Sequence, residues 1–268
     1  MLIKRLLTAV ILIPLVIVTT LKLDSYDFVL AMIPLLVISS WEYSGLIKIK
    51  HWATKVLYIS ALVTSAYFLY QKPFSLMPLL TVTLVWWFIN SFWIISFPKH
   101  TRYWHSYLVT RLVNGFFFFV PLLVSLSALH QIDRTLVLLL LSLVWAADSG
   151  AYLVGRAIGK NKLLPNVSPG KTIEGAVGGT LLSLSVMLVY VYFSFENADF
   201  EKYFFYGVLS LITTLASILG DLFESLHKRV AGVKDSGILL PGHGGFFDRI
   251  DSLTASAPIF FLAYSFLT

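Results

Sequence analysis

Residues 135–157 read TLVLLLLSLVWAADSGAYLVGRA, an apolar run in which Asp148 is the only acidic residue. An α-helix needs about 20 mainly apolar residues to cross the hydrocarbon core of a bilayer, so this run is long enough to span a membrane. A carboxylate inside such a helix costs roughly 2.5–3.5 kcal/mol on insertion scales. Asp148 therefore needs a metal ion, water or another functional partner, or else a structural hydrogen bond to a neighbouring helix.

Comparable apolar runs recur along the whole chain. Of its 268 residues, 57% are hydrophobic and only 13% are charged, against about 25% charged in an ordinary soluble domain. The absence of cysteine excludes disulfide scaffolds, thiolate zinc sites and cysteine nucleophiles. We therefore expect an all-α, polytopic membrane protein with about nine transmembrane helices. The candidate spans are roughly 6–21, 28–47, 56–71, 76–97, 107–129, 135–157, 173–195, 203–223 and 252–268.

The basic residues are distributed unevenly between the two sides of the predicted membrane. The N-terminus and the connections after the second, fourth, sixth and eighth spans carry 15 of the 20 Lys and Arg residues. The other connections carry four, and Arg111 lies inside the fifth span. The positive-inside rule places the N-terminus in the cytoplasm and the C-terminus outside. The net charge of +6 thus reflects the topology of the protein in the membrane. The sequence contains no soluble module with a basic face, so we expect no nucleic-acid partner.

The longest polar segments, 156–172 and 224–251, fall on the predicted cytoplasmic side. We therefore expect residues 131–268 to form the catalytic region and residues 1–130 to supply supporting helices. Glu42 lies near the cytoplasmic end of the second span, where either interfacial solvation or a functional role accounts for it.

The end of the eighth span carries four polar residues with helical spacing. They are Asp221, Glu224, Ser225 and Lys228. Residues three or four apart lie on one helical face, so the four side chains should point the same way. A helix that leaves the membrane shows the same pattern when its end becomes solvated, and both interpretations stay open for this segment alone.

The segment that follows combines glycines, basic residues and carboxylates beside the bilayer. Gly242, Gly244 and Gly245 let backbone N–H groups approach an anion closely. Asp248 and Asp251 offer the hard oxygen ligands that suit magnesium. The basic residues of this region are Lys228, Arg229, Lys234 and Arg249. This combination predicts a site for a metal-bound polyphosphate.

The other polar segment contains Gly170-Lys171-Thr172, which is similar to part of a Walker A motif. That motif needs a glycine five residues before Gly170, where this chain has Pro165, and no strand is expected before it. We therefore reject the Walker interpretation. Gly175 and Gly179 follow at four-residue spacing, which predicts close packing of the seventh span against a neighbour.

These motifs together resemble the phosphatidate cytidylyltransferases, also called CDP-diacylglycerol synthases. One part of the resemblance is Ser225, Lys228-Arg229, Lys234-Asp235, Pro241-Gly242-His243-Gly244-Gly245, Asp248-Arg249 and Asp251. Another is Asp148, Ala151-Tyr152, Gly155-Arg156, Gly159-Lys160, Ser168-Pro169, Lys171-Thr172, Glu174-Gly175 and the pair Asp221 and Glu224. The specific motifs cover about residues 145–251, and the first 140 residues match only in hydropathy and loosely at Trp41-Glu42.

The resemblance implies that CTP and phosphatidate give CDP-diacylglycerol and pyrophosphate, with a divalent metal, at the cytoplasmic face of the cell (inner) membrane. It also implies a helical fold that is often a homodimer. We expect Asp221 and Asp248 to hold magnesium together over the triphosphate. Asp251 and Asp148 are expected to be further ligands or partners of the ligands, around one or two ions. The expected catalytic residues are Lys171, Glu174, Lys228, Arg229, His243 and Arg249. The expected substrate-binding residues are Ser168, Thr172, Lys234, Gly242, Gly244 and Gly245.

The lipid substrate sets a further expectation. Withdrawing acyl chains from a bilayer costs about 0.8 kcal/mol per CH₂, so the site should be a cavity between the sixth, seventh and eighth spans that opens toward the lipid. Two alternatives remain. A related enzyme acting on another lipid phosphate, such as an ether lipid, would use the same motifs. An anion transporter is less favoured, because it should show inverted repeats, whereas here the ionisable residues gather in one half and on one side.

Overall fold

The computed structural model describes residues 2–239 and 244–267, and within these it contains nine long helices. They are α1 (Leu2–Lys22), α2 (Ser25–Leu46), α3 (Trp52–Tyr70), α4 (Leu76–Ser96), α6 (Leu108–Ile132), α7 (Arg134–Ile158), α8 (Ile173–Ser194), α9 (Phe200–Ala231) and α10 (Phe247–Leu267). The shorter elements are the 3₁₀ helix η1 (Pro73–Ser75), α5 (Thr101–His105), β1 (Lys162–Leu164) and β2 (Ser168–Thr172). The predicted all-helical architecture is confirmed.

Seven of these helices are long and apolar enough to cross a membrane, judged on the described residues. They are α2, α3, α4, α6, α7, α8 and α9. The protein is therefore a multi-pass membrane protein, as predicted, while nine crossings and the sides of the two termini stay predictions.

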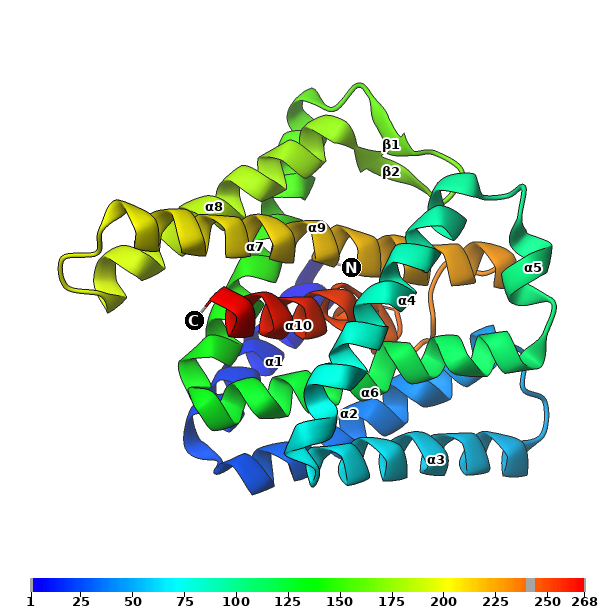
Figure 1. Ribbon diagram of the computed structural model, residues 1–268. Coiled ribbons are helices and arrows are strands. Elements are labelled where there is room, and N and C mark those ends of the chain that lie inside the picture. The colour runs from blue at the N-terminus through cyan, green and yellow to red at the C-terminus, as the bar shows by residue number, and fades with distance from the viewer. Residues whose placement is uncertain (1, 240–243, 268) are drawn as a thin grey trace.

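Several helices run side by side, so that their connections gather at two opposite ends. In Figure 1, α2, α3, α6 and α9 cross the view together, with α5 and the connections after α2 and α9 at the right. The α8–α9 connection and the C-terminus lie at the left. This arrangement brings the polar segment after α9 to the same end as α5, with the β-hairpin above it.

Helix α9 extends well beyond the apolar run that predicts it. It continues to Ala231 and ends at Gly232, whose φ of 78° is the left-handed conformation that favours glycine. The N–H of Gly232 donates to the carbonyl of Arg229, and that of Val233 donates to Lys228. Asp221, Glu224 and Lys228 thus lie on one continuous helix, as their spacing predicts.

Helices α7 and α8 pack backbone against backbone. A Cβ added to Gly179 would lie within 3.0 Å of the carbonyl oxygen of Ala147, and one added to Gly150 would lie 2.7 Å from that of Gly178. The close packing predicted for Gly175 and Gly179 is confirmed, since a Cβ on Gly175 would lie 2.8 Å from the carbonyl oxygen of Ala151.

Strands β1 and β2 form an antiparallel hairpin, so the expectation that no strand precedes Gly170-Lys171-Thr172 is wrong. They are three and five residues long, too short for a period-two pattern to stand out. Val167 in their turn is 1% exposed and packs into the protein core, which explains why this polar segment is ordered.

Two apolar clusters form the core, and both draw on both halves of the chain. One joins Tyr43 and Phe118 to Phe223 and Phe247, and the other joins Phe28 to Leu140 and Phe260. The functional division into residues 1–130 and 131–268 stays a prediction, but the two regions share their core.

Candidate active site

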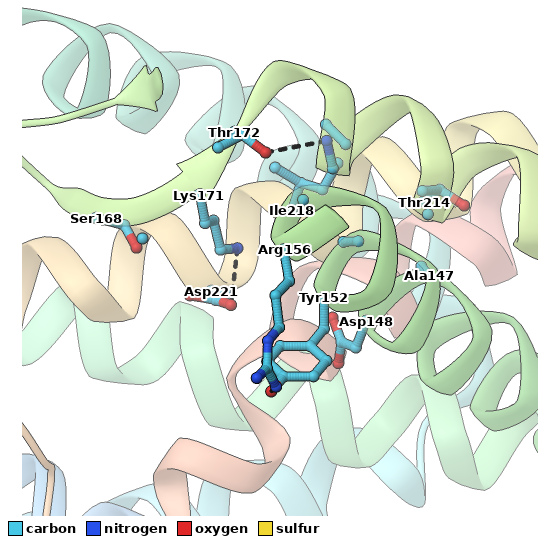
Figure 2. A pocket seen from close by; sticks show the side chains of 16 residues that line it. Ala147, Asp148, Tyr152, Arg156, Ser168, Lys171, Thr172, Thr214, Ile218 and Asp221 are labelled. Carbon is cyan, nitrogen blue, oxygen red and sulfur yellow. Dashed lines mark hydrogen bonds and ion pairs between the residues drawn. The ribbon is translucent and has the colours of Figure 1, made fainter. Parts of the chain in front are cut away.

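A cavity of about 490 Å³ lies between α7, α8, α9 and the β-hairpin. Its position agrees with the cavity expected between the sixth, seventh and eighth spans. Figure 2 shows the side chains of Lys171, Asp221, Asp148, Arg156 and Tyr152 around it. The cavity therefore has charged groups of both signs on walls that also contain apolar residues, glycines and the hydroxyl groups of Ser168, Thr172 and Thr214.

The best-defined contact in the cavity joins the hairpin to α9. Lys171 Nζ lies 2.7 Å from Asp221 Oδ2, and both side chains are 26% exposed. Arg156 Nη1 donates to the hydroxyl of Tyr152 at 2.9 Å on the α7 side (Figure 2). These partly exposed groups are accessible to a ligand that enters the cavity.

A second polar cluster is buried between α9 and the start of α10. Lys228 Nζ lies 2.5 Å from Glu224 Oε2 and 2.7 Å from Asp248 Oδ1. Glu224 is 0% exposed and also interacts electrostatically with Asp251. Among the described residues, two carboxylates thus contact one lysine directly, and Asp251 adds a third acidic side chain nearby.

Asp251 connects the buried cluster with the cavity. It interacts electrostatically with Asp148 and Asp221 as well as with Lys228. Asp148 in turn interacts with Lys171 and Arg249. The carboxylates assigned to metal binding therefore form a continuous negative region, although no group of three or more His, Asp or Glu in the described part of the chain is arranged to hold a metal ion.

The two aspartates expected to share a metal ion have different partners in the structure. Asp221 pairs with Lys171, whereas Asp248 pairs with Lys228. Asp248 also accepts backbone N–H bonds from Ser236, at 3.2 and 3.0 Å to its two oxygens, and from Gly245 at 2.8 Å. A shared ion stays a prediction, and the carboxylates that interact electrostatically with Asp221 are Asp148 and Asp251.

Three residues predicted for catalysis or substrate binding make structural contacts. The Thr172 hydroxyl accepts from the N–H of Gly175 and caps α8, as the upper dashed line in Figure 2 shows. Glu174 accepts from the backbone N–H and side-chain amide of Asn161. Arg229 Nε donates to the carbonyl of Val167 at 3.2 Å. These contacts fix the loop beside the cavity, and any direct role with substrate stays a prediction.

The remaining predicted residues are placed as follows. Ser168 lines the cavity, Arg249 and Lys234 are exposed, and Gly244 has a φ of 82°. Gly242 and His243 lie outside the described residues. The predicted substrate contacts of this turn therefore stay predictions.

Two acidic residues of the buried cluster and its surroundings, Glu224 and Glu42, stand out in the sequence but are absent from the site residues predicted above. Glu224 has the helical spacing to both Asp221 and Lys228, and this spacing was the signal that could have identified it. Glu42 accepts three hydrogen bonds from the segment that leads into α10. No local pattern connects Glu42 with a segment almost 200 residues away.

Comparison with known proteins gives consistent matches over the whole chain. The model of the "Cytidylyltransferase family" matches residues 3–267. A phosphatidate cytidylyltransferase of Haemophilus influenzae is 34% identical over 289 aligned residues, covering 100% of both chains. The Pseudomonas aeruginosa protein of that name is 35% identical over 262 residues, covering 97% of this chain and 96% of its own. A Staphylococcus aureus protein of that name is 50% identical over 117 residues, or 44% of each chain. These matches, together with the cavity and the charged cluster, show that the chain belongs to the cytidylyltransferase family.

Proposed function

We propose that this protein is a phosphatidate cytidylyltransferase, which transfers the cytidylyl group of CTP to phosphatidate and releases pyrophosphate. The observation that carries the proposal is the cavity between α7, α8 and α9, where Lys171 and Asp221 face Asp148 and adjoin the buried carboxylate cluster. The full-length similarity to proteins of that name supports this choice of substrates.

The chemistry needs charge compensation more than it needs a base. The second ionisation of a phosphate monoester lies near pH 6, by analogy with phosphoserine, so the phosphatidate oxygen is already a nucleophile at neutral pH. This oxygen forms a bond to the α-phosphorus of CTP as the bond between that phosphorus and the bridging oxygen to the β-phosphorus breaks. Each pair of like charges at 4 Å costs about 4 kcal/mol at an effective dielectric of 20. The protein must therefore hold cations beside both phosphate groups.

The positions of the described basic residues support this role. Lys171 stands at the cavity, where it can exchange its contact with Asp221 for a contact with a phosphate oxygen. Lys228 is held deeper by Glu224 and Asp248, and its charge acts on the same region. Arg249 acts on Asp148 from the start of α10. Such preorganised charges stabilise a transition state without reorganising during the reaction.

The chemistry of the carboxylates suits a divalent metal ion, although no three of them in the described part of the chain are arranged as ligands. The buried cluster gathers three acidic side chains around Lys228, and Glu224 Oε1 is buried without a hydrogen-bond donor among the described residues. Carboxylate oxygens are the ligands that magnesium prefers. We propose that Asp221, Asp251, Asp148 and Asp248 hold one or two magnesium ions. When bound, magnesium would neutralise charge on the triphosphate and the departing pyrophosphate.

The site is proposed to face the cytoplasm from the cell (inner) membrane. The bias of 15 basic residues against four between the two sides supports this orientation. A homodimer is also proposed, from the family resemblance, and cross-linking in membranes followed by mass measurement tests it.

The reaction is tested by incubating the purified protein in detergent with labelled CTP, phosphatidate and magnesium, and omitting each component in turn. We expect a CMP-bearing lipid and pyrophosphate only in the complete mixture. An ether-lipid phosphate in place of phosphatidate tests the alternative substrate. Product formation with the ether lipid alone would replace the proposed substrate, and no product with either lipid would reject the proposal.

A further inference from the structure

Helix α10 takes the hydrogen-bond acceptors for its first turn from a distant helix. Glu42, on α2, accepts from the N–H of Phe246 at 3.0 Å and from that of Phe247 at 2.8 Å. These are among the backbone donors that the start of a helix leaves unsatisfied. A capping side chain usually comes from the residue just before the helix, but here that residue is Phe246, whose side chain has no hydrogen-bond acceptor.

The glycines around Glu42 are required by close packing. A Cβ added to Gly245 would lie within 3.0 Å of Ser236 Oγ and Glu42 Oε2, and one added to Gly237 would lie within 3.0 Å of Glu42 Oε1. The Glu42 carboxylate thus fills the space that side chains at these positions would occupy. Gly245 therefore has a structural reason to be glycine, besides its predicted role in phosphate binding.

Ser236 bridges the distant carboxylate and a carboxylate of the buried cluster. Its hydroxyl donates to Glu42 Oε2 at 3.1 Å, and its backbone N–H donates to Asp248 Oδ2 at 3.0 Å. The N–H of Gly245 donates to the same oxygen of Asp248 at 2.8 Å. The position of Asp248 therefore depends on a segment that Glu42 holds in place.

The surroundings of Glu42 distinguish this role from interfacial solvation. The residue is only 9% exposed, and among the described residues it forms no ion pair with lysine or arginine. Burying a carboxylate is costly unless hydrogen bonds compensate it. Its donors are one hydroxyl and two N–H groups at a helix N-terminus, where the helix dipole favours a negative charge. A carboxylate solvated at the membrane surface would have none of these partners.

We infer that Glu42 is a positioning residue, which acts through Ser236 and the first turn of α10 to orient Asp248 toward Lys228. The N-terminal half of the chain then contributes to the geometry of the site as well as to its support. Two measurements test this inference. The measurement of enzyme activity rests on the proposed function, whereas the measurement of amide hydrogen exchange does not.

The first experiment compares Glu42→Gln with wild type, using Glu196→Gln at an exposed position as the matched control. The amide group keeps the size of the side chain but turns one acceptor into a donor that opposes an N–H group. We expect amide hydrogen exchange in residues 244–248 to rise at least tenfold, with little change in the middle of α9. Because a misplacement of about 1 Å can cost 100-fold, kcat should fall by about that factor. Glu196→Gln should resemble wild type in both measurements.

The second experiment uses Ser236→Ala, which removes one hydroxyl and keeps the carboxylate. We expect the same local increase in exchange and a smaller loss of kcat. The double variant with Glu42→Gln should lose no more activity than Glu42→Gln alone, because both changes break one connection. Wild-type exchange in residues 244–248 of both variants, or fully additive losses of activity, would overturn the inference. A general rise in exchange over all helices would also overturn it, because Glu42 would then support the fold as a whole.

The two proposals fail in different ways. If wild type makes no lipid product from phosphatidate, the proposed function fails, and the exchange measurements still test the position of α10. If wild type is active and Glu42→Gln keeps its full kcat, the positioning role fails and the proposed function stands.

Discussion

Replacing Lys228 with methionine should destabilise the protein strongly. The ammonium group lies 2.5 Å from Glu224 and 2.7 Å from Asp248, and the residue is 8% exposed. Removing one partner of a buried ion pair costs about 3–5 kcal/mol, because the remaining charge loses its compensation. Methionine occupies a similar volume, so the lost charge should dominate over any cavity.

Thermal unfolding in detergent, followed by tryptophan fluorescence, measures this loss. A change of 1 kcal/mol shifts the midpoint by about 2–4 °C in chains of roughly this size, so we expect a decrease of about 6–20 °C. Lys99→Met changes an exposed lysine in the same way and should shift the midpoint by less than about 2 °C. A midpoint for Lys228→Met equal to that of Lys99→Met would refute the charge-pair reasoning.

A double variant separates charge from packing. Adding Glu224→Gln to Lys228→Met removes one of the charges that the first change leaves uncompensated. The double variant should recover several degrees of the lost midpoint, because neighbouring sites in one network are not additive. A double variant less stable than Lys228→Met alone would show that Glu224 stabilises the core by packing or hydrogen bonding.

Three further changes test other parts of the structure. Asp221→Asn should abolish both turnover and the dependence on magnesium, measured by pyrophosphate release, and normal activity would remove Asp221 from the proposed metal site. Gly179→Val should cost about 1–3 kcal/mol by overpacking, because its side chain would meet the backbone of Ala147, and an unchanged unfolding midpoint would contradict the tight α7–α8 contact. Gly232→Ala should cost roughly 1–2 kcal/mol, because φ is 78° there, and unfolding in detergent measures the loss against a neutral Gly170→Ala control.

The sequence predicts the helices well because membrane spanning is a local property of the chain. A run of about 20 apolar residues must form a helix in the bilayer whatever its neighbours are. The same reasoning anticipates the cavity, since Asp148 lies inside one apolar run, and Lys171 and Asp221 lie near the ends of the following two, beside the polar segments. The hairpin at 162–172 could not be predicted from the sequence, because its ordered structure depends on Val167, which packs into a core made by distant helices.

The partner of an individual charged residue is harder to predict than a helix. The difficulty increases with the number of residues that separate the two partners in the sequence. Glu224 and Lys228 are four residues apart on one helix, so their contact follows from helical geometry. Lys228 contacts Asp248 across 20 residues of sequence, and Glu42 contacts Ser236 and Phe247 across 194 and 205 residues. Such contacts require the packing of α2 against the start of α10, and periodicity carries no information about it.

This separation explains why an acidic residue near a span end is ambiguous in the sequence. Glu42 and Asp148 both lie in apolar helices, yet Asp148 is exposed to the cavity while Glu42 is buried against backbone donors. A carboxylate that faces a cavity can exchange its partners for a ligand, whereas one that caps a helix cannot do so without releasing that helix. The first kind of residue is suited to binding and the second to positioning. In this protein the buried cluster around Lys228 is connected to both residues, to Glu42 through Ser236 and Asp248 and to Asp148 through Asp251. The geometry of the site therefore depends on the cavity residue and on the positioning residue.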